Sequence, residues 1–247
     1  MLRHLLALLL LWSGGYAYAS DLTMLIGENP PFNSFRESRP EGLAVQIVDV
    51  MLQRSGLSVR YAEYPWSRAQ KLAQTEPGHC VYTLSRLPER ENAYEWIGPI
   101  AVNPWAFFAL RERRIKLKGL DDARQYTIAG QRNDGKAIWL ESQGFVLDYA
   151  AKESQGLKKV ASGRLDLFPG GLYSLPELAV QAEVDPARFE PLLVFHRIEY
   201  YVACNKNTDP GKLRRLRAAL AGMKVDQSFE RITQRAVASF RNPLQQR

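Results

Sequence analysis

Hydrophobic and polar positions alternate along the chain in two periods, which predict strands and helices in a regular order. The first unit has strands at 21–27, at 57–64 and from His79, and helices at 43–55 and 67–75. Gly56 stands where the first of these helices should end, because glycine readily adopts the left-handed conformation of a C-cap. Strands that alternate with helices are typical of an α/β domain with a largely parallel sheet.

A second unit of the same kind follows. It has strands at 126–130, 145–149 and 165–168, and helices at 136–143 and 153–162. Two extended aromatic segments, 105–110 and 198–203, lie between and after the units, and helices at 210–223 and 226–239 close the chain. Because no linker rich in Pro, Gly and Ser separates the units, we expect two crossings between them.

The N-terminus has the pattern of a secretory signal peptide. Arg3 supplies a positive charge, residues 5–12 are all apolar, and Ala17 and Ala19 form a small-x-small cleavage pattern. We therefore predict a signal peptide over residues 1–19 and an exported, periplasmic chain. A membrane anchor is the alternative, but a bilayer span needs about 20 apolar residues.

Composition indicates a folded globular protein. The chain has 247 residues, of which 46% are hydrophobic and 24% charged, and its formal charge is +7. A basic excess is compatible with a nucleic acid, a membrane surface or an acidic ligand. Because an exported protein meets little nucleic acid, we expect no nucleic-acid partner, and the basic runs at 111–118 and 212–217 are interpreted as solvated faces.

Cys80 and Cys204 each lie in an apolar segment with strand character. Export permits a disulfide between them, but the sequence does not give the separation of their Cα atoms. One disulfide and two buried free thiols both remain open.

Signatures of catalysis and of metal binding are mostly missing. Beyond residue 19 the histidines are His79 and His196, and neither has a Cys, a His or paired acids at the spacing of metal ligands. Nucleophile elbows and phosphate-binding glycine loops are also missing. We therefore predict no catalytic residue, no metal and no cofactor.

Three short polar segments follow the predicted strands of the first unit, at residues 28–32, 65–68 and 83–90. In open α/β sheets, ligands bind outside the carboxyl ends of the strands. Trp66 offers a flat aromatic face, Thr83 and Ser85 alternate along a strand end, and the planar fork of Arg90 suits a carboxylate.

These segments carry a family resemblance. Pro30 to Phe32 after the first strand, the turn at 65–68, Ser85 with Arg90, and residues 96–100 occur in an order that resembles the periplasmic solute-binding proteins of ABC transporters, the polar amino-acid-binding family 3. The resemblance implies an α/β fold of two lobes joined by two hinge strands, the type II periplasmic-binding-protein fold, with a small-molecule ligand in the cleft and a membrane permease as partner. We assign residues 20–108 and 201–247 to lobe I and residues 109–200 to lobe II.

The resemblance also implies roles for single residues. Arg90 matches the arginine that binds the α-carboxylate of the ligand, and Thr83 and Ser85 match cleft residues that hydrogen-bond it. Trp66 matches an apolar platform, and Asn29 lies where many relatives have an aromatic residue. Arg68 either lines the cleft or lies on the surface.

Two positions in lobe II depart from the family pattern. Asp134 opens a helix where relatives place a Gly-Ser or Gly-Thr pair facing the carboxylate, and its charge disfavours an anion there. Gly171 stands where relatives carry the acid that receives the ligand's ammonium. The ligand thus either reaches Asp134 from another direction or has no α-amino group.

The expected function is that of a monomeric periplasmic protein that captures a small polar solute, an amino acid-like compound, an organic acid or an amine. Two alternatives stay open. One is a sensory module that reports a solute to a membrane protein, and the other is a dehydratase-like enzyme on the same scaffold, with Asp134 or Glu28 as its acid.

Overall fold

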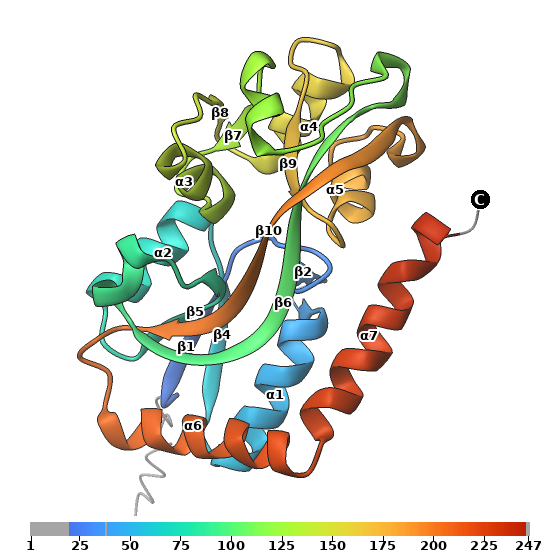
Figure 1. Cartoon of the computed structure of the whole chain (residues 1–247). Helices are drawn as coiled ribbons and strands as arrows, with labels where there is room; N and C mark the ends of the chain where they lie inside the picture. Colours follow the sequence, from blue (N-terminus) through green and yellow to red (C-terminus); the bar gives the residue numbers. More distant parts are fainter. Residues whose placement is uncertain (1–19, 38, 246–247) are drawn as a thin grey trace, which may run out of the picture.

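The computed structural model describes residues 20–37 and 39–245, which form two α/β halves connected by two long strands (Figure 1). The predicted signal peptide, residues 1–19, lies outside the described residues. The strands are β1 Leu22–Ile26, β2 Ser34–Arg36, β3 Arg39–Glu41, β4 Val59–Glu63, β5 His79–Ser85, β6 Glu95–Leu110, β7 Ala129–Gln131, β8 Asp148–Ala150, β9 Phe168–Gly171 and β10 Phe189–Cys204. The α-helices are α1 Leu43–Ser55, α2 Trp66–Thr75, α3 Gly135–Ser142, α4 Glu153–Ala161, α5 Leu175–Gln181, α6 Pro210–Val225 and α7 Ser228–Gln245. Short 3₁₀ helices span Pro88–Ala93, Arg111–Arg113, Leu120–Gln125 and Pro186–Arg188.

The main sheet has the order β4-β1-β5-β10-β6-β9. Strands β4, β1 and β5 are parallel, whereas β10 runs antiparallel to β5 and β6, and β6 runs antiparallel to β9. Strands β7 and β8 form a separate parallel pair. The predicted α/β class with parallel strands is therefore confirmed for the strands that alternate with helices.

Alternation along β1 places its side chains in two hydrophobic layers. Leu22, Met24 and Ile26 join a core with α1, α6 and α7, while Leu25 lies on the other face with Ala69 of α2. This burial fixes the register of β1 in the sheet, and its carboxyl end leads into the polar segment at Glu28.

Strands β6 and β10 pair over almost their whole length, from Phe189 opposite Leu110 to Cys204 opposite Glu95. They run from one half of the molecule into the other and are the two crossings that the sequence predicted (Figure 1). The lobe boundaries at 108/109 and 200/201 fall inside these strands.

The boundaries of the elements differ most in lobe II. Strands β7, β8 and β9 are short, and each begins three residues later than predicted. β9 ends on Pro169, Gly170 and Gly171, residue types that weaken a strand, and it is an edge strand held only by its pairing with β6. The β2–β3 hairpin and helix α5 were not predicted.

Cys80 and Cys204 form a disulfide. Both are fully buried and occupy directly paired positions of β5 and β10. The bond therefore ties the C-terminal end of the second crossing strand to the centre of the lobe I sheet, and the alternative of two free thiols is wrong.

Candidate functional site

Two adjoining cavities lie between the halves of the molecule, where the carboxyl ends of lobe I strands face α3 and α4. The inner cavity has a volume of about 20 Å³ and is lined by Glu28, Asn29, Trp66, Thr83, Ser85, Trp105, Gln131, Asp134, Lys136, Glu153 and Tyr200. The outer cavity has a volume of about 520 Å³. Glu28, Trp66, Gln131 and Glu153 line both cavities, so these side chains form their shared wall.

The end of β5 positions Thr83 by an irregularity in the sheet. Leu84 pairs with Tyr201 and Tyr82 pairs with Val202, so Thr83 is the extra residue of a bulge. Its backbone is left-handed, with φ at 59°, which is unusual for a β-branched residue. Its hydroxyl donates to Asn33, and this contact supports the strained backbone beside the inner cavity.

Lys136 lies between two carboxylates at the inner end of the site. Its ammonium is 3.1 Å from an Asp134 oxygen and 3.2 Å from Glu153 Oε1, and it stands 5.9 Å from the centre of the Trp105 ring. Asp134 caps α3 by accepting from the backbone N–H of Lys136 at 2.9 Å. All three charged side chains are less than one-fifth exposed.

Burial and the neighbouring charges shift the pKa values of Lys136 and Glu153. Burial alone lowers the pKa of the Lys136 ammonium, but the carboxylates of Asp134 and Glu153 outweigh it and raise that pKa. Burial raises the pKa of the Glu153 carboxyl, the charge of Asp134 adds to the rise, and Lys136 opposes it. The triad therefore brings two acids and one base to the cleft.

The halves contact each other around Asn133. Its carbonyl oxygen accepts from Arg90 Nη2 at 2.6 Å and from Gln70 Nε2 at 3.2 Å, and its side-chain amide donates to Ser67 Oγ at 3.1 Å. Asn133 itself is left-handed, with φ at 59°, a conformation that asparagine tolerates better than most residues. This structure is therefore a closed arrangement, with lobe II held against lobe I.

Two further contacts cross the cleft. Glu28 of lobe I accepts from Gln181 Nε2 of α5 in lobe II at 3.0 Å, and within lobe I it accepts from the backbone of Phe35 at 3.0 Å. Gly135 approaches β5 so closely that an added Cβ would lie 2.1 Å from Ser85 Oγ. A Cβ at this position would force the Ser85 hydroxyl to move and would still press on Ser85 Cβ and the Trp105 ring, at 3.1 and 3.2 Å.

Of the seven residues that the sequence predicted for the site, the structure brings five together. Asn29, Trp66, Thr83, Ser85 and Asp134 line the inner cavity.

Arg90 and Arg68 do not line either cavity. Arg90 is buried and donates through Nη1 to Ser85 O and Ser85 Oγ, at 3.3 and 3.1 Å, and through Nη2 to Asn133. Arg68 is exposed and stacks over the ring of Tyr64 at 4.9 Å, which is the surface alternative.

Gly171 lies away from the cavity lining, paired with Trp105 at the end of β9. An added Cβ would lie 2.2 Å from Asn103 Nδ2. Asn103 thus closes the position at which the resemblance led us to look for an ammonium-binding acid.

Sequence reasoning missed Lys136, Glu153 and Gln131 as site residues. Lys136 and Glu153 each lie in the first turn of a predicted helix, where a charge is commonly solvated. Their spacing in the sequence does not predict an ion pair. Glu28 was named only as the acid of the alternative enzyme, although its place after β1 puts it at the shared wall.

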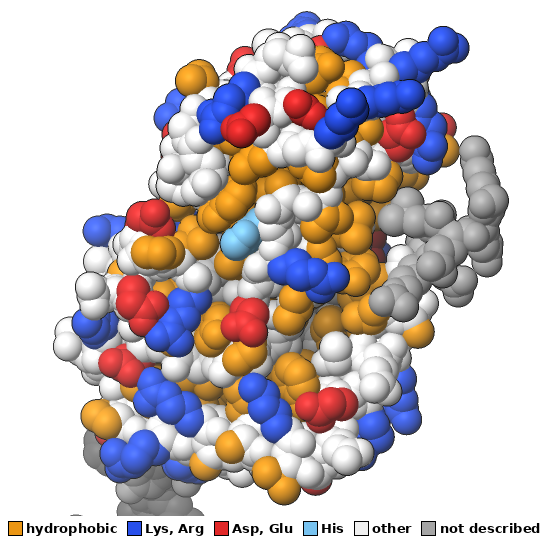
Figure 2. All heavy atoms as spheres, in the orientation of Figure 1, with side chains coloured by type: hydrophobic (Ala, Val, Ile, Leu, Met, Phe, Trp, Pro, Cys, Tyr) orange, Lys and Arg blue, Asp and Glu red, His pale blue; other side chains and the backbone are white. Residues whose placement is uncertain are grey.

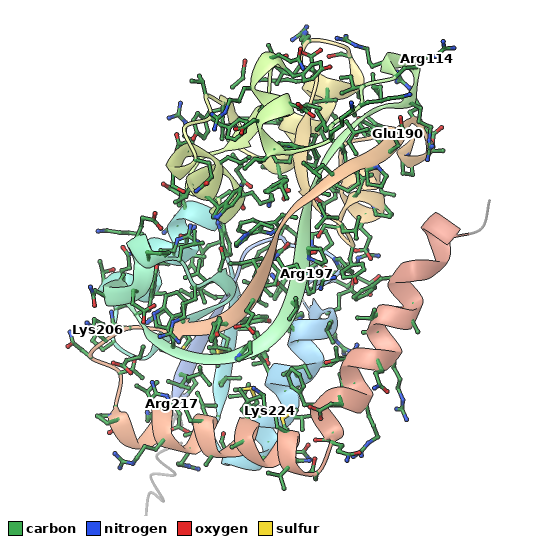
Figure 3. The ribbon with its side chains drawn as sticks, viewed as in Figure 1. Arg114, Glu190, Arg197, Lys206, Arg217 and Lys224 are labelled. Carbon is green, nitrogen blue, oxygen red and sulfur yellow. A yellow bond between two sulfur atoms is a disulfide. The ribbon has the colours of Figure 1, made fainter. Side chains whose placement is uncertain are left out.

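Charge is distributed unevenly over the molecule. Arg114 lies at the outer end of lobe II, and Arg217 and Lys224 lie on α6 at the opposite end (Figure 3). On the face shown in Figure 2, hydrophobic side chains gather over the crossing strands, between these charged ends. The basic runs are exposed, apart from a few apolar residues, and are thus largely solvated faces, as predicted.

Among residues 20–37 and 39–245, no helix combines the length and hydropathy that a membrane crossing requires. Within the same residues, no group of three or more His, Cys, Asp or Glu side chains is arranged to hold a metal ion.

Comparisons with known proteins agree with this architecture. The profile of bacterial extracellular solute-binding proteins, family 3, matches residues 22–238. A comparison with curated protein sequences gave no significant match.

Solved structures resemble the whole two-lobed chain. A histidine kinase sensor domain with similarity to periplasmic binding proteins has a TM-score of 0.79 at 18% identity, covering 88% of this chain and 95% of its own. The arginine-, lysine-, histidine-binding protein ArtJ from Geobacillus stearothermophilus has a TM-score of 0.75 at 13% identity, with coverages of 88% and 95%. An ancestral amino acid-binding protein, a precursor of cyclohexadienyl dehydratase, has a TM-score of 0.71 at 15% identity, with coverages of 87% and 93%. At these identities the likeness shows the fold.

Proposed function

Because the chain belongs to family 3 of the bacterial extracellular solute-binding proteins, we propose that it captures a small polar solute between its lobes and delivers it to the membrane permease of an ABC transporter. The observation that carries this proposal is the 520 Å³ cavity, which is lined by residues of both lobes and has the size of a ligand pocket. The proposal includes a periplasmic, monomeric protein whose signal peptide, residues 1–19, is removed, and no nucleic-acid partner.

Closure of the lobes is the proposed binding step. A solute that contacts both lobes favours the closed state over an open one by its difference in affinity for the two. The contacts of Asn133 with Arg90, Gln70 and Ser67 support this step, because they form only when the lobes meet.

The proposed ligand contacts come from the lining of the cavities. Trp66 supplies an apolar face from the start of α2, and Asn29, Thr83 and Ser85 supply polar groups from the strand ends of lobe I. Asp134 belongs to the lobe II side of the same site.

We propose binding rather than catalysis. The two acids of the alternative enzyme are both held by protein groups, Asp134 by Lys136 and Glu28 by Phe35 and Gln181. An acid that exchanges protons with a substrate needs a free oxygen facing it, and these contacts favour fixed charges instead.

Thermal-shift screening of the chain without residues 1–19 tests the proposed function. The panel covers amino acids, amines, organic acids and sugars. A solute at 100 times its dissociation constant adds about 2.7 kcal/mol to the free energy of unfolding, which raises the Tm by roughly 5–10 °C for a chain of this size. Absence of any stabilising solute from the whole panel contradicts solute capture.

Gly135→Ala tests the closure step. The added methyl group meets Ser85 Oγ at 2.1 Å, which makes that hydroxyl rotate, and it still meets Ser85 Cβ and the Trp105 ring at 3.1 and 3.2 Å, so the closed lobes must move apart slightly. We expect the affinity for the best solute of the panel to fall at least about tenfold, which is about 1.4 kcal/mol, in isothermal titration.

Gly119→Ala is the matched control. An added Cβ at Gly119 has no heavy atom within 4 Å, and its φ of −156° suits any residue. Wild-type affinity is expected for this variant. If Gly135→Ala also binds with wild-type affinity, the proposed closure is wrong.

A further inference from the structure

Resting on the proposed function, we infer that the cleft selects a small organic cation without a carboxylate group, an amine or a guanidinium compound. Four features of the site lead to this ligand class: the sign of its charges, the occupation of its basic groups, the volumes of its two cavities, and the carboxylates and aromatic face at their shared wall.

Carboxylates dominate the cavity lining, although the whole chain is basic. The side chains that line the two cavities include the carboxylates of Glu28, Glu63, Asp134 and Glu153, but only two lysines, Lys136 and Lys152. A cleft with walls of low dielectric concentrates the field of such charges. A cation is therefore drawn into this site, and an anion is repelled.

The two basic groups nearest the inner cavity are already engaged. Lys136 is held between Asp134 and Glu153. Both terminal nitrogens of Arg90 donate to protein oxygens, Nη1 to Ser85 and Nη2 to Asn133, and Arg90 does not line the cavities. A ligand carboxylate would have to displace the Asn133 carbonyl, which joins the lobes.

The volumes of the two cavities also favour a ligand without a carboxylate. The inner cavity, beside Thr83 and Ser85, has a volume of only about 20 Å³, whereas the outer cavity has about 520 Å³. The ligand therefore occupies the outer cavity, and a carboxylate near Ser85 finds little room.

The shared wall offers what a cation needs. Glu153 lines both cavities as part of this wall, and its Oε1 is buried beside the Lys136 ammonium at 3.2 Å, so its carboxylate charge is shared between that lysine and a ligand. Glu28 lines both cavities, and each of its oxygens accepts one bond, from Phe35 or from Gln181, and keeps a second lone pair for a ligand donor. Trp66 adds an aromatic face that attracts cations. The geometry thus provides carboxylate oxygens and a π surface for an ammonium or guanidinium head.

Matched pairs of an amino acid and its decarboxylated amine test this inference by isothermal titration: arginine and agmatine, lysine and cadaverine, histidine and histamine, with glutamate as the anionic control. We expect the amine of at least one pair to bind at least about ten times more tightly than its parent, and no binding of glutamate. If amino acids bind more tightly than their amines, or only an uncharged or anionic solute of the broad panel binds, the inference is wrong while solute capture stands. If no solute binds at all, both fail.

Variants locate the cation. Glu153→Gln keeps the shape of the side chain and removes one charge, and we expect amine affinity to fall at least about tenfold. Glu28→Gln is also expected to lower the affinity for the amine. Because Glu28 does not pair with Lys136, this variant tests the cation site without disturbing that ion pair. Glu230→Gln, on the exposed surface of α7, is the matched control and should bind as the wild type does. Unchanged amine affinity in both cleft variants overturns the inference.

Arg90→Gln separates the two roles of Arg90. If Arg90 only joins the lobes, its loss lowers the affinity for an amine and the affinity for its parent amino acid by the same factor. The ratio of the two affinities then stays constant. Selective loss of the amino acid's affinity would assign Arg90 to a ligand carboxylate and contradict the inference.

Discussion

Cys80→Ala combined with Cys204→Ala is expected to lower the free energy of unfolding by about 2–5 kcal/mol. The disulfide joins residues separated by 124 positions, so its loss frees a very long loop in the unfolded chain. A loop of this length corresponds to about 5 kcal/mol in the chain-entropy description. Both cysteines are fully buried, and alanine avoids placing a hydroxyl group in the core.

Urea unfolding of both proteins, with and without reductant, measures this effect. The reduced wild type is the control and should unfold close to the double alanine variant. Thiol titration of the unreduced, unfolded wild type should find no free thiol. Equal unfolding midpoints for the oxidised wild type and the variant, or two free thiols, would show that this bond does not stabilise the folded chain.

Lys136→Met is expected to destabilise the fold by about 3–5 kcal/mol at neutral pH, because it leaves two largely buried carboxylates without their cation. Methionine keeps much of the length of the lysine side chain and removes the charge. Lys136→Arg, which keeps the charge, is the control and should lose less. The free energy of unfolding from urea titrations measures both variants.

The loss in free energy of unfolding that Lys136→Met causes, here called its deficit, depends on pH in a predictable direction. A carboxyl whose pKa is raised in the folded protein stabilises the fold at low pH, and this stabilisation is lost as pH rises from the unfolded value through the folded one. The Glu153 carboxyl has such a raised pKa, and without Lys136 its pKa rises further. We therefore expect the deficit to shrink as pH falls from 7 towards 5. A deficit that stays constant or grows over this interval would contradict the buried triad.

Much of lobe I follows from local pattern. Helix α1 has the predicted bounds, and Gly56 ends it in the left-handed conformation with φ at 61°. Strand β1 alternates between two hydrophobic layers, and Trp66, Thr83 and Ser85 face the cleft because the carboxyl ends of neighbouring strands meet there. Each of these features depends on residues close together in the sequence.

The crossing strands are longer than the sequence indicates because they contain proline. Pro99 and Pro104 in β6 and Pro191 in β10 lack the N–H that a ladder needs, so they interrupt the pattern of a strand. The structure accommodates them with irregular pairing, including a register shift between Pro191 and Leu193. Propensity alone does not reveal such long-range compensation.

The charge of the cleft could not be predicted either, since it arises where separate elements meet. Lys136 of α3 and Glu153 of α4 meet within lobe II, and closure of the lobes brings Glu28, which follows β1, to the same site. The family resemblance directed attention to Arg90, whose guanidinium contacts lobe II instead of the cavity. The chain therefore has the architecture of its family, and the place of Arg90 in this structure differs from the one that the resemblance implied.

A crystal structure of the protein with the tightest-binding solute of the panel tests the proposed site most directly. We expect electron density for the solute in the outer cavity, against Trp66, with its cationic group facing Glu153 and with Arg90 still donating to the Asn133 carbonyl. Density for the solute on another surface, or a solute carboxylate bound to Arg90 in place of that carbonyl, would contradict the proposed site.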